Sequence, residues 1–145
     1  MTNTSFSAMI EPLALAVQRA KKPLMDATIR ILLRYADRNT PEKSGVLRRG
    51  NQSDVVASGD YGRVFNQVPY AGFVHNGTPP HVIVPKRPGG VLVFQIGGKT
   101  IFTKRVNHPG TNANPFYDRA VQQSDDERMA LLQRTGDTIV ARSRG

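Results

Sequence analysis

The sequence predicts an α+β fold: a long N-terminal helix and a C-terminal helix pack against a small antiparallel β-sheet with a prominent hairpin. Three observations lead to this prediction. Apolar residues recur at spacings of three and four over residues 8–38, and the same spacing returns over residues 115–139. Short strand-like runs bounded by Gly and Pro fill the middle of the chain. The length of 145 residues suits a single domain, 1–145, with residues 1–7 and about 141–145 expected to be mobile.

Residues 8–38 are expected to form one helix with a kink at Pro23. The apolar stripe keeps its phase on both sides of this proline, although the ring removes a backbone hydrogen bond. Pro12 suits the first turn of the helix. After it, Ser44 is expected to cap a short second helix. The predicted apolar stripe consists of Ile10, Leu13, Val17, Ala20, Leu24, Thr28, Ile31, Leu32 and Tyr35.

The centre of the chain predicts one hairpin, one short helix and one short strand. The runs 54–58 and 63–67 form the hairpin around Gly-Asp-Tyr-Gly. Pro69 begins the short helix, and Gly77 ends it at positive φ. Three of its apolar side chains are expected to share a face that packs on the sheet: Tyr70, Phe73 and Val74. Residues 81–84 then form a strand.

Residues 91–106 predict the clearest hairpin, with its turn at Gly-Gly-Lys. A three-residue turn places Phe94 opposite Phe102, whereas a two-residue turn places Ile101 there instead. We expect the three-residue turn, because it pairs two aromatic side chains. In the last helix, which follows, Asn114 is expected to be the N-cap and Pro115 the first residue.

The composition limits the classes of function. The chain has 20 Lys+Arg against 11 Asp+Glu, which favours contact with polyanions or acidic proteins. It has no cysteine, which excludes disulfides, thiolate zinc sites and cysteine nucleophiles. No apolar run approaches the ~20 residues of a membrane helix, and no signal peptide is visible, so we expect a soluble protein without membrane contact.

The histidines His75, His81 and His108 are the strongest candidates for chemistry. Their spacing matches no standard zinc pattern, and their positions at a helix end and beside loops suit backbone contacts. A hydrolase would combine a His and a Ser with one of Asp54, Asp60 and Asp118, but the sequence has no nucleophile elbow. We therefore expect no catalytic residue, no metal site, no cofactor and no enzymatic activity.

Three segments, in this order, resemble one known family. "TPEKSGVLRRG" is similar to its Thr-Pro-x-x-(Ser/Thr)-Gly-x-Leu-Arg segment, and "PYAGFVHNGTPPHVIVPK" to its Tyr-Ala-x-x-Val-(His/Glu)-x-Gly-Thr segment. "FTKRVNHPGTNANPFYDRA" is similar to its closing hairpin, His-Pro-Gly loop and Asn-Pro-Phe helix start. The family is that of tail-completion (head–tail joining, neck or minor tail) proteins of long-tailed bacteriophages. The matching positions are Pro41, Gly45, Leu47, Arg48, Tyr70, Ala71, Val74, His75, Gly77, Thr78, His108, Pro109, Gly110, Pro115 and Phe116.

The resemblance implies a structural virion protein at the head–tail junction, made in the host cytoplasm. It implies a ring of copies, usually hexameric, between head-side connector or stopper proteins and the tail terminator or tail tube, with DNA passing through the lumen. The alternatives are a basic nucleic-acid-binding module of a mobile element and a small hydrolase. Six residues are candidates for contact with a polyanion or an acidic partner: Arg48, Arg49, Lys86, Arg87, Lys104 and Arg105.

Overall fold

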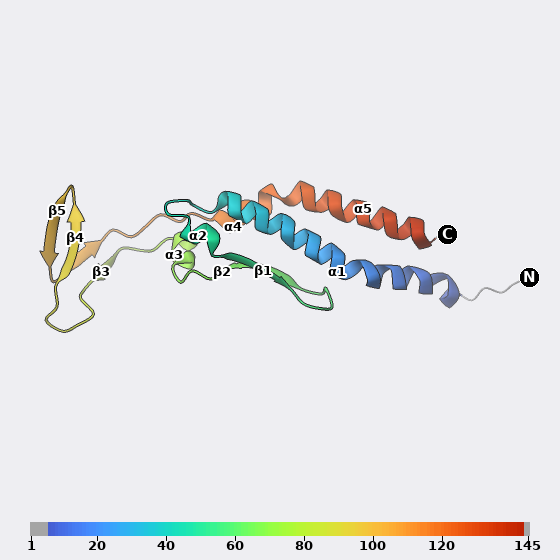
Figure 1. The fold of residues 1–145 in the computed structure, drawn as a ribbon, viewed down its shortest axis with the longest axis horizontal. Helices are drawn as coiled ribbons and strands as arrows, with labels where there is room; N and C mark the ends of the chain where they lie inside the picture. Colours follow the sequence, from blue (N-terminus) through green and yellow to red (C-terminus); the bar gives the residue numbers. More distant parts are fainter. Residues whose placement is uncertain (1–5, 144–145) are drawn as a thin grey trace, which may run out of the picture. The chain divides into compact units, whose positions relative to one another are not determined.

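A computed structural model describes residues 6–143 of the chain, with side chains from Ile10 onward, and confirms the predicted α+β class (Figure 1). The elements are α1 (Phe6–Asn39), α2 (Val46–Arg49), β1 (Asn51–Val55), β2 (Gly62–Asn66), α3 (Ala71–Asn76), β3 (His81–Ile83), β4 (Leu92–Ile96), β5 (Lys99–Thr103), β6 (Val106–His108), α4 (Phe116–Gln123) and α5 (Asp125–Ser143). The strands form three separate two-stranded antiparallel sheets, β1–β2, β3–β6 and β4–β5.

The described chain divides into two compact units. The helical unit contains the described residues up to Ala71 and from Phe116 on, and the hairpin unit is Gly72–Pro115. The mobility expected for residues 1–7 and about 141–145 lies mostly outside the described residues. Where the two overlap, residues 6 and 7 belong to α1, and 141–143 belong to α5.

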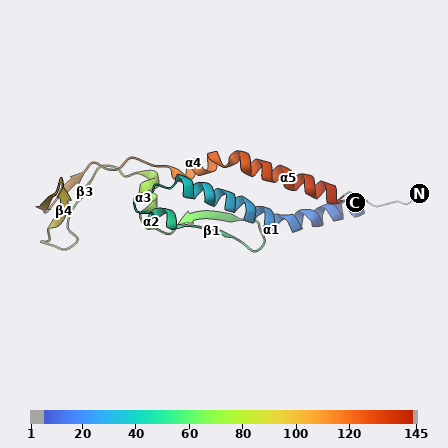
Figure 2. The same ribbon diagram turned by 45° about the horizontal axis from the view of Figure 1, so that its top comes forward.

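In the helical unit, α1 contacts the β1–β2 hairpin and both C-terminal helices (Figures 1 and 2). The helix is continuous through both of its prolines, and Pro12, expected in the first turn, lies inside it because α1 begins at Phe6. The tip of the β1–β2 hairpin lies against the α1 backbone: a Cβ added at Gly59 would be 2.6 Å from the Cα of Lys22. Lys21 forms an ion pair with Asp60 of the same tip.

The apolar core of the helical unit is small and lies around the second half of α1. Phe116 is its largest fully buried side chain. No residue of the predicted stripe of α1 is fully buried: Ile10, Leu13 and Val17 are exposed, and the other six are half-buried. The fully buried residues Ile29 and Ala36 lie outside the stripe. The tip of the β1–β2 hairpin lies beside Lys22, so this hairpin does not extend to the exposed residues Ile10, Leu13 and Val17. The buried apolar residues are Ile29, Ala36, Leu47, Ala71, Phe116 and Ala120.

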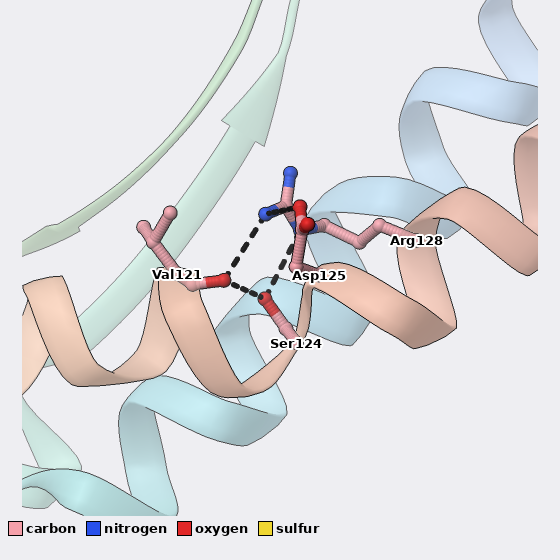
Figure 3. A network of polar contacts seen from close by, with 4 residues as sticks. All are labelled: Val121, Ser124, Asp125 and Arg128. Carbon is pink, nitrogen blue, oxygen red and sulfur yellow. Dashed lines mark hydrogen bonds and ion pairs between the residues drawn. The ribbon is translucent and has the colours of Figure 1, made fainter.

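The single C-terminal helix expected from the sequence is divided at Ser124 into α4 and α5 (Figure 3). Ser124 is fully buried, and its hydroxyl donates to the carbonyl oxygen of Val121 at 3.0 Å. Arg128 Nε donates to Ser124 Oγ at 3.0 Å, and Arg128 Nη2 donates to both Val121 O and Asp125 Oδ1. These side-chain bonds hold the junction at a point where the regular helix is interrupted.

The β4–β5 hairpin has the two-residue turn, so the three-residue turn we expected is wrong. Ile96 pairs with Lys99, and Phe94 pairs with Ile101. Gly97 and Gly98 both have positive φ, at 56° and 77°. Two such residues form a turn whose twist matches the twist of the paired strands, which outweighs the gain from pairing two aromatic side chains.

The long second strand expected in this hairpin is also interrupted. The Thr103 hydroxyl donates to the carbonyl oxygen of Arg105 and accepts from the Arg105 N–H, which ends β5. The chain then continues as β6, which pairs with β3 from Ile83↔Val106 to His81↔His108. The hairpin unit therefore contains two small sheets where one was expected.

Candidate interaction surface

The first motif, residues 40–50, forms the corner between α1 and α2. Thr40 is buried, and its hydroxyl donates to Ala36 O at 2.7 Å, which closes the end of α1. Gly45 is the N-cap of α2 with φ 72°, and no side chain caps the helix, so the expected cap at Ser44 is wrong. Leu47 fills the core from α2. Pro41 lies between the two helices, at a position where neither continues.

A buried polar network around Asn51 stabilises this corner, and the sequence did not predict it. Asn51 Nδ2 donates to Asp37 Oδ1 and Thr40 Oγ1, both at 2.9 Å. Asn51 Oδ1 accepts from Asn66 Nδ2 at 2.8 Å and from the Tyr117 hydroxyl at 2.9 Å. All the polar positions of this amide are thus satisfied, as a buried polar group requires. Burial also raises the pKa of the Tyr117 hydroxyl.

The second motif, residues 69–78, contains a helix end that needs glycine, as predicted. Gly77 follows α3 with φ 73°, and a Cβ added there would be 2.5 Å from Thr111 O. The interpretation of the α3 face is wrong for two residues, because Tyr70 and Phe73 are exposed. Ala71 is the buried residue of this helix, and Val74 is half-buried.

The third motif, residues 108–116, lies directly opposite the second. Thr78 and Thr111 exchange two backbone hydrogen bonds at 3.0 Å, and Asn114 N donates to Val74 O at 3.0 Å. Gly110 has φ 88°, and a Cβ there would collide with Thr78 O. Gly77 and Gly110 thus allow the backbones of the second and third motifs to pack directly against each other. Pro109 and Pro115 lie outside the regular elements, Pro115 immediately before α4, and Phe116 enters the core.

The structure brings together two of the three histidines. His81 and His108 are opposite each other in β3–β6, with ring centroids 5.0 Å apart. His81 Nδ1 donates to Pro79 O, while His108 Nδ1 accepts from the N–H of Gly110. His75 Nδ1 lies 2.9 Å from Asn76 Oδ1. Over residues 6–143, no group of three or more His, Cys, Asp or Glu side chains is arranged to hold a metal ion.

The β4–β5 hairpin exposes large apolar side chains on both faces. Val93 and Phe102 are paired on one face and are 60% and 69% exposed. Ile96 is 63% exposed on the other face, and Ile101 lies on that same face. Among the described residues, β4 and β5 pair only with each other, so each has an open strand edge.

The hairpin unit is also entirely basic in its formal charges. Residues 72–115 contain five Lys and Arg and no Asp or Glu. Four of the six predicted contact residues belong to it: Lys86, Arg87, Lys104 and Arg105. The other two belong to the helical unit, where Arg48 pairs with Glu42 and Arg49 Nη2 donates to Ser44 O. The six residues are therefore not one surface of a single unit.

Comparisons with protein-family models, with curated proteins and with solved structures find no match for this chain. None of the helices in the described part of the chain combines the length and the apolar character that crossing a membrane requires. The arrangement of the described residues consists of structural joints, an exposed apolar hairpin and a basic unit.

Proposed function

We propose that this protein is a structural component of the bacteriophage neck, which joins the DNA-filled head to the tail. In this proposal, copies of the chain form a ring between the head-side connector or stopper proteins and the tail terminator or tail tube. Its location is the virion, at the head–tail junction, and it has no enzymatic activity. The ordered resemblance of three segments to tail-completion proteins provides the class of function.

The β4–β5 hairpin is the observation that supports an assembly role most directly. A two-stranded hairpin is at best marginally stable in water, and this one leaves Val93, Ile96 and Phe102 exposed. Neighbouring subunits would cover these side chains and extend the open strand edges. Ring closure then adds avidity to contacts that are individually weak.

The positions of the motif residues are consistent with this role. Gly77 and Gly110 provide close backbone contacts, and Leu47 and Phe116 provide core. The side chains at these four positions include no nucleophile and no general base. A family defined by such residues shares a scaffold, on which surface contacts can vary between partners.

The excess of basic residues in the hairpin unit favours a second candidate, a nucleic-acid-binding module. Five basic and no acidic side chains in residues 72–115 would contact a DNA backbone without sequence preference. The same charge suits the lumen of a neck ring or an acidic neighbouring protein. Binding of the isolated protein to DNA that weakens steeply with salt would favour the nucleic-acid-binding candidate.

The test is a phage in which the coding sequence of this protein is disrupted. Electron microscopy of the lysate should show DNA-filled heads and complete tails that do not join. Purified protein added to that lysate should restore infectivity, and the variant Val93→Thr with Phe102→Thr should restore much less. Empty heads would instead indicate a packaging role, and normal infectious particles would indicate that the protein is not structural; either result contradicts the proposal.

A further inference from the structure

The two long helices of the helical unit form a groove that the described residues leave unfilled. α1 and α5 run antiparallel and contact each other, with the first half of α1 beside the second half of α5 (Figure 1). The groove is lined by residues from Pro12 to Ala27 on α1 and from Leu131 to Arg142 on α5, and its volume is about 700 Å³. At 1.5 Å per residue, the α1 side extends over ~22 Å.

The floor of the groove is apolar. On the α1 side, Ala16, Ala20 and Ala27 line it together with Leu15 and Leu24. On α5, the hydroxyls of Thr135 and Thr138 donate to backbone carbonyls of their own helix, at 2.9 Å in each case. These hydroxyls are thus satisfied without a partner in the groove.

The charged side chains that line the groove are all arginines. Arg19 lines the α1 side, and Arg134 and Arg142 line the α5 side. No carboxylate lines the groove, and in the described part of the chain none forms an ion pair with any of the three. They contrast with Arg34 and Arg128, which pair with Glu127 and Asp125 elsewhere on the same helices.

We propose that this groove binds an amphipathic helix of another protein, with its apolar face on the apolar floor and acidic side chains beside the three arginines. A third helix fits between two antiparallel helices, and small residues at the contact allow close approach. Charge complementarity requires the acidic flanks. A second copy of α1 fits poorly, because α1 has six basic and three acidic side chains and would bring further net positive charge to the arginines. This inference does not rest on the proposed phage function.

The test uses the full chain and two fluorescent peptides of about 18 residues, a length that supports a helix. Both carry leucine along one face; one has glutamates beside the leucines and the other has lysines. Fluorescence anisotropy should show that the glutamate peptide binds at micromolar concentration and that the lysine peptide binds at least about tenfold more weakly. Hydrogen exchange should show protection of residues 12–27 and 131–142 by the glutamate peptide.

Three variants assign the binding to the groove. Arg134→Glu with Arg142→Glu should lower the affinity for the glutamate peptide about tenfold and raise the affinity for the lysine peptide. Ala20→Phe should lower the affinity for the glutamate peptide, because the larger side chain occupies part of the groove. Arg30→Glu is the matched control, since Arg30 is exposed on α1 outside the groove, and it should change affinity less than about twofold. Circular dichroism should show equal helix content in all variants.

Several results would overturn the inference. These are no binding of either peptide, equal binding of both, or equal effects of the groove variants and the Arg30 control. Preferential protection of the same residues by vesicles of anionic phospholipid would assign the groove to a lipid surface. Loss of self-association in Ala20→Phe would assign it to a second copy. Failure of the phage test would leave the peptide result unchanged, so the two proposals are tested separately.

Discussion

At the scale of single residues, two glycines of the hairpin unit, Gly77 and Gly72, differ in whether the structure requires glycine at their position. Gly77 needs its missing side chain, because its φ is 73° and a Cβ would approach Thr111 O and Ala113 N. Gly72, inside α3, has nothing within 4 Å of the corresponding position. The same substitution is therefore expected to have opposite effects at the two sites.

Gly77→Ala should lower the free energy of unfolding by ~1–3 kcal/mol, through backbone strain and the contact with Thr111. Gly72→Ala should raise it by ~0.5–1 kcal/mol, because alanine loses less entropy in a helix. Gly77→Val should also be more damaging than His75→Ala or His81→Ala. Chemical denaturation monitored at the hairpin unit measures these changes. Equal effects of the two alanine substitutions would contradict the assigned helix end.

Asn51→Asp should destabilise the helical unit by ~2–3 kcal/mol at neutral pH. The substitution keeps the shape but removes the two donors to Asp37 and Thr40, and it places a carboxylate beside that of Asp37. Part of the loss should be recovered in acid, where a protonated carboxyl can donate again. Gln52→Glu is the matched control on the exposed side of β1, and urea titration should show little change for it. A neutral result at Asn51 would mean that the network contributes nothing to stability.

At the scale of the elements, α1 and α5 are connected by an ion pair between Arg34 and Glu127. The hydrogen bond from the Arg34 guanidinium lowers the pKa of the Glu127 carboxyl. A lowered pKa in the folded state contributes stability above the unfolded pKa, and this contribution is lost as the pH falls through the folded pKa. The pair is exposed, so its effect should be small and sensitive to salt.

We therefore expect the melting temperature of the wild type to fall more steeply than that of Glu127→Gln as the pH decreases below about 5. Arg34→Ala should flatten the curve in the same way. The pKa values of Asp54 and Asp60 are also lowered, by hydrogen bonds from Arg63 and Lys21. These two carboxyls contribute equally to the pH dependence of the wild type and of Glu127→Gln, so they do not change the comparison. Parallel curves for the wild type and Glu127→Gln would show that the pair does not form in solution.

The β4–β5 hairpin should respond to substitution as a surface and not as a core. Val93→Thr with Phe102→Thr keeps β-forming residues and should leave the melting temperature of the isolated protein nearly unchanged, because both side chains are exposed. Phe116→Ala, in the buried core, should instead lower the free energy of unfolding by ~3–5 kcal/mol. Thermal unfolding followed by circular dichroism makes the comparison. A large loss in the threonine variant would place the hairpin in a core.

At the scale of the whole molecule, the helical unit is built from two parts of the chain that are separated by the hairpin unit. All the buried apolar residues in the described part of the chain belong to the helical unit. Thr78 and Thr111 already pair across two backbone hydrogen bonds, which is the geometry that a two-residue turn closes. The helical unit should therefore fold without most of the hairpin unit.

Replacing residues 79–110 with Asn-Gly should preserve the helical circular dichroism signal and the melting temperature of the helical unit. Asn-Gly suits the turn, because both residues tolerate positive φ. A matched chain carries Gly77→Val in addition to the Asn-Gly replacement. This substitution disturbs the turn but not the core, so the matched chain should be less stable than the Asn-Gly chain if the turn closes as expected. Loss of cooperative unfolding in the Asn-Gly chain would show that the two units do not fold independently.

Elements that depend on neighbouring residues could be predicted from the sequence. Periodic apolar residues predicted the long helices, and Gly77 predicted the end of α3, because both signals act within one or two helical turns. The same local reasoning failed at Ser44 and in the β4–β5 turn, where glycines at positive φ determined the conformation. In the latter case, the twist required by two glycines outweighed a plausible side-chain pair.

Contacts between side chains that are distant in the sequence depend on how the elements pack. Tyr117 bonds to Asn51 across 66 positions of the chain, and no local pattern encodes that distance. The division of the C-terminal helix at the buried Ser124 and the groove between α1 and α5 are likewise features of the packed elements. Burial and long-range hydrogen bonding depend on how elements pack, so Leu13 of the predicted stripe is exposed, whereas Ile29, outside the stripe, lies in the core.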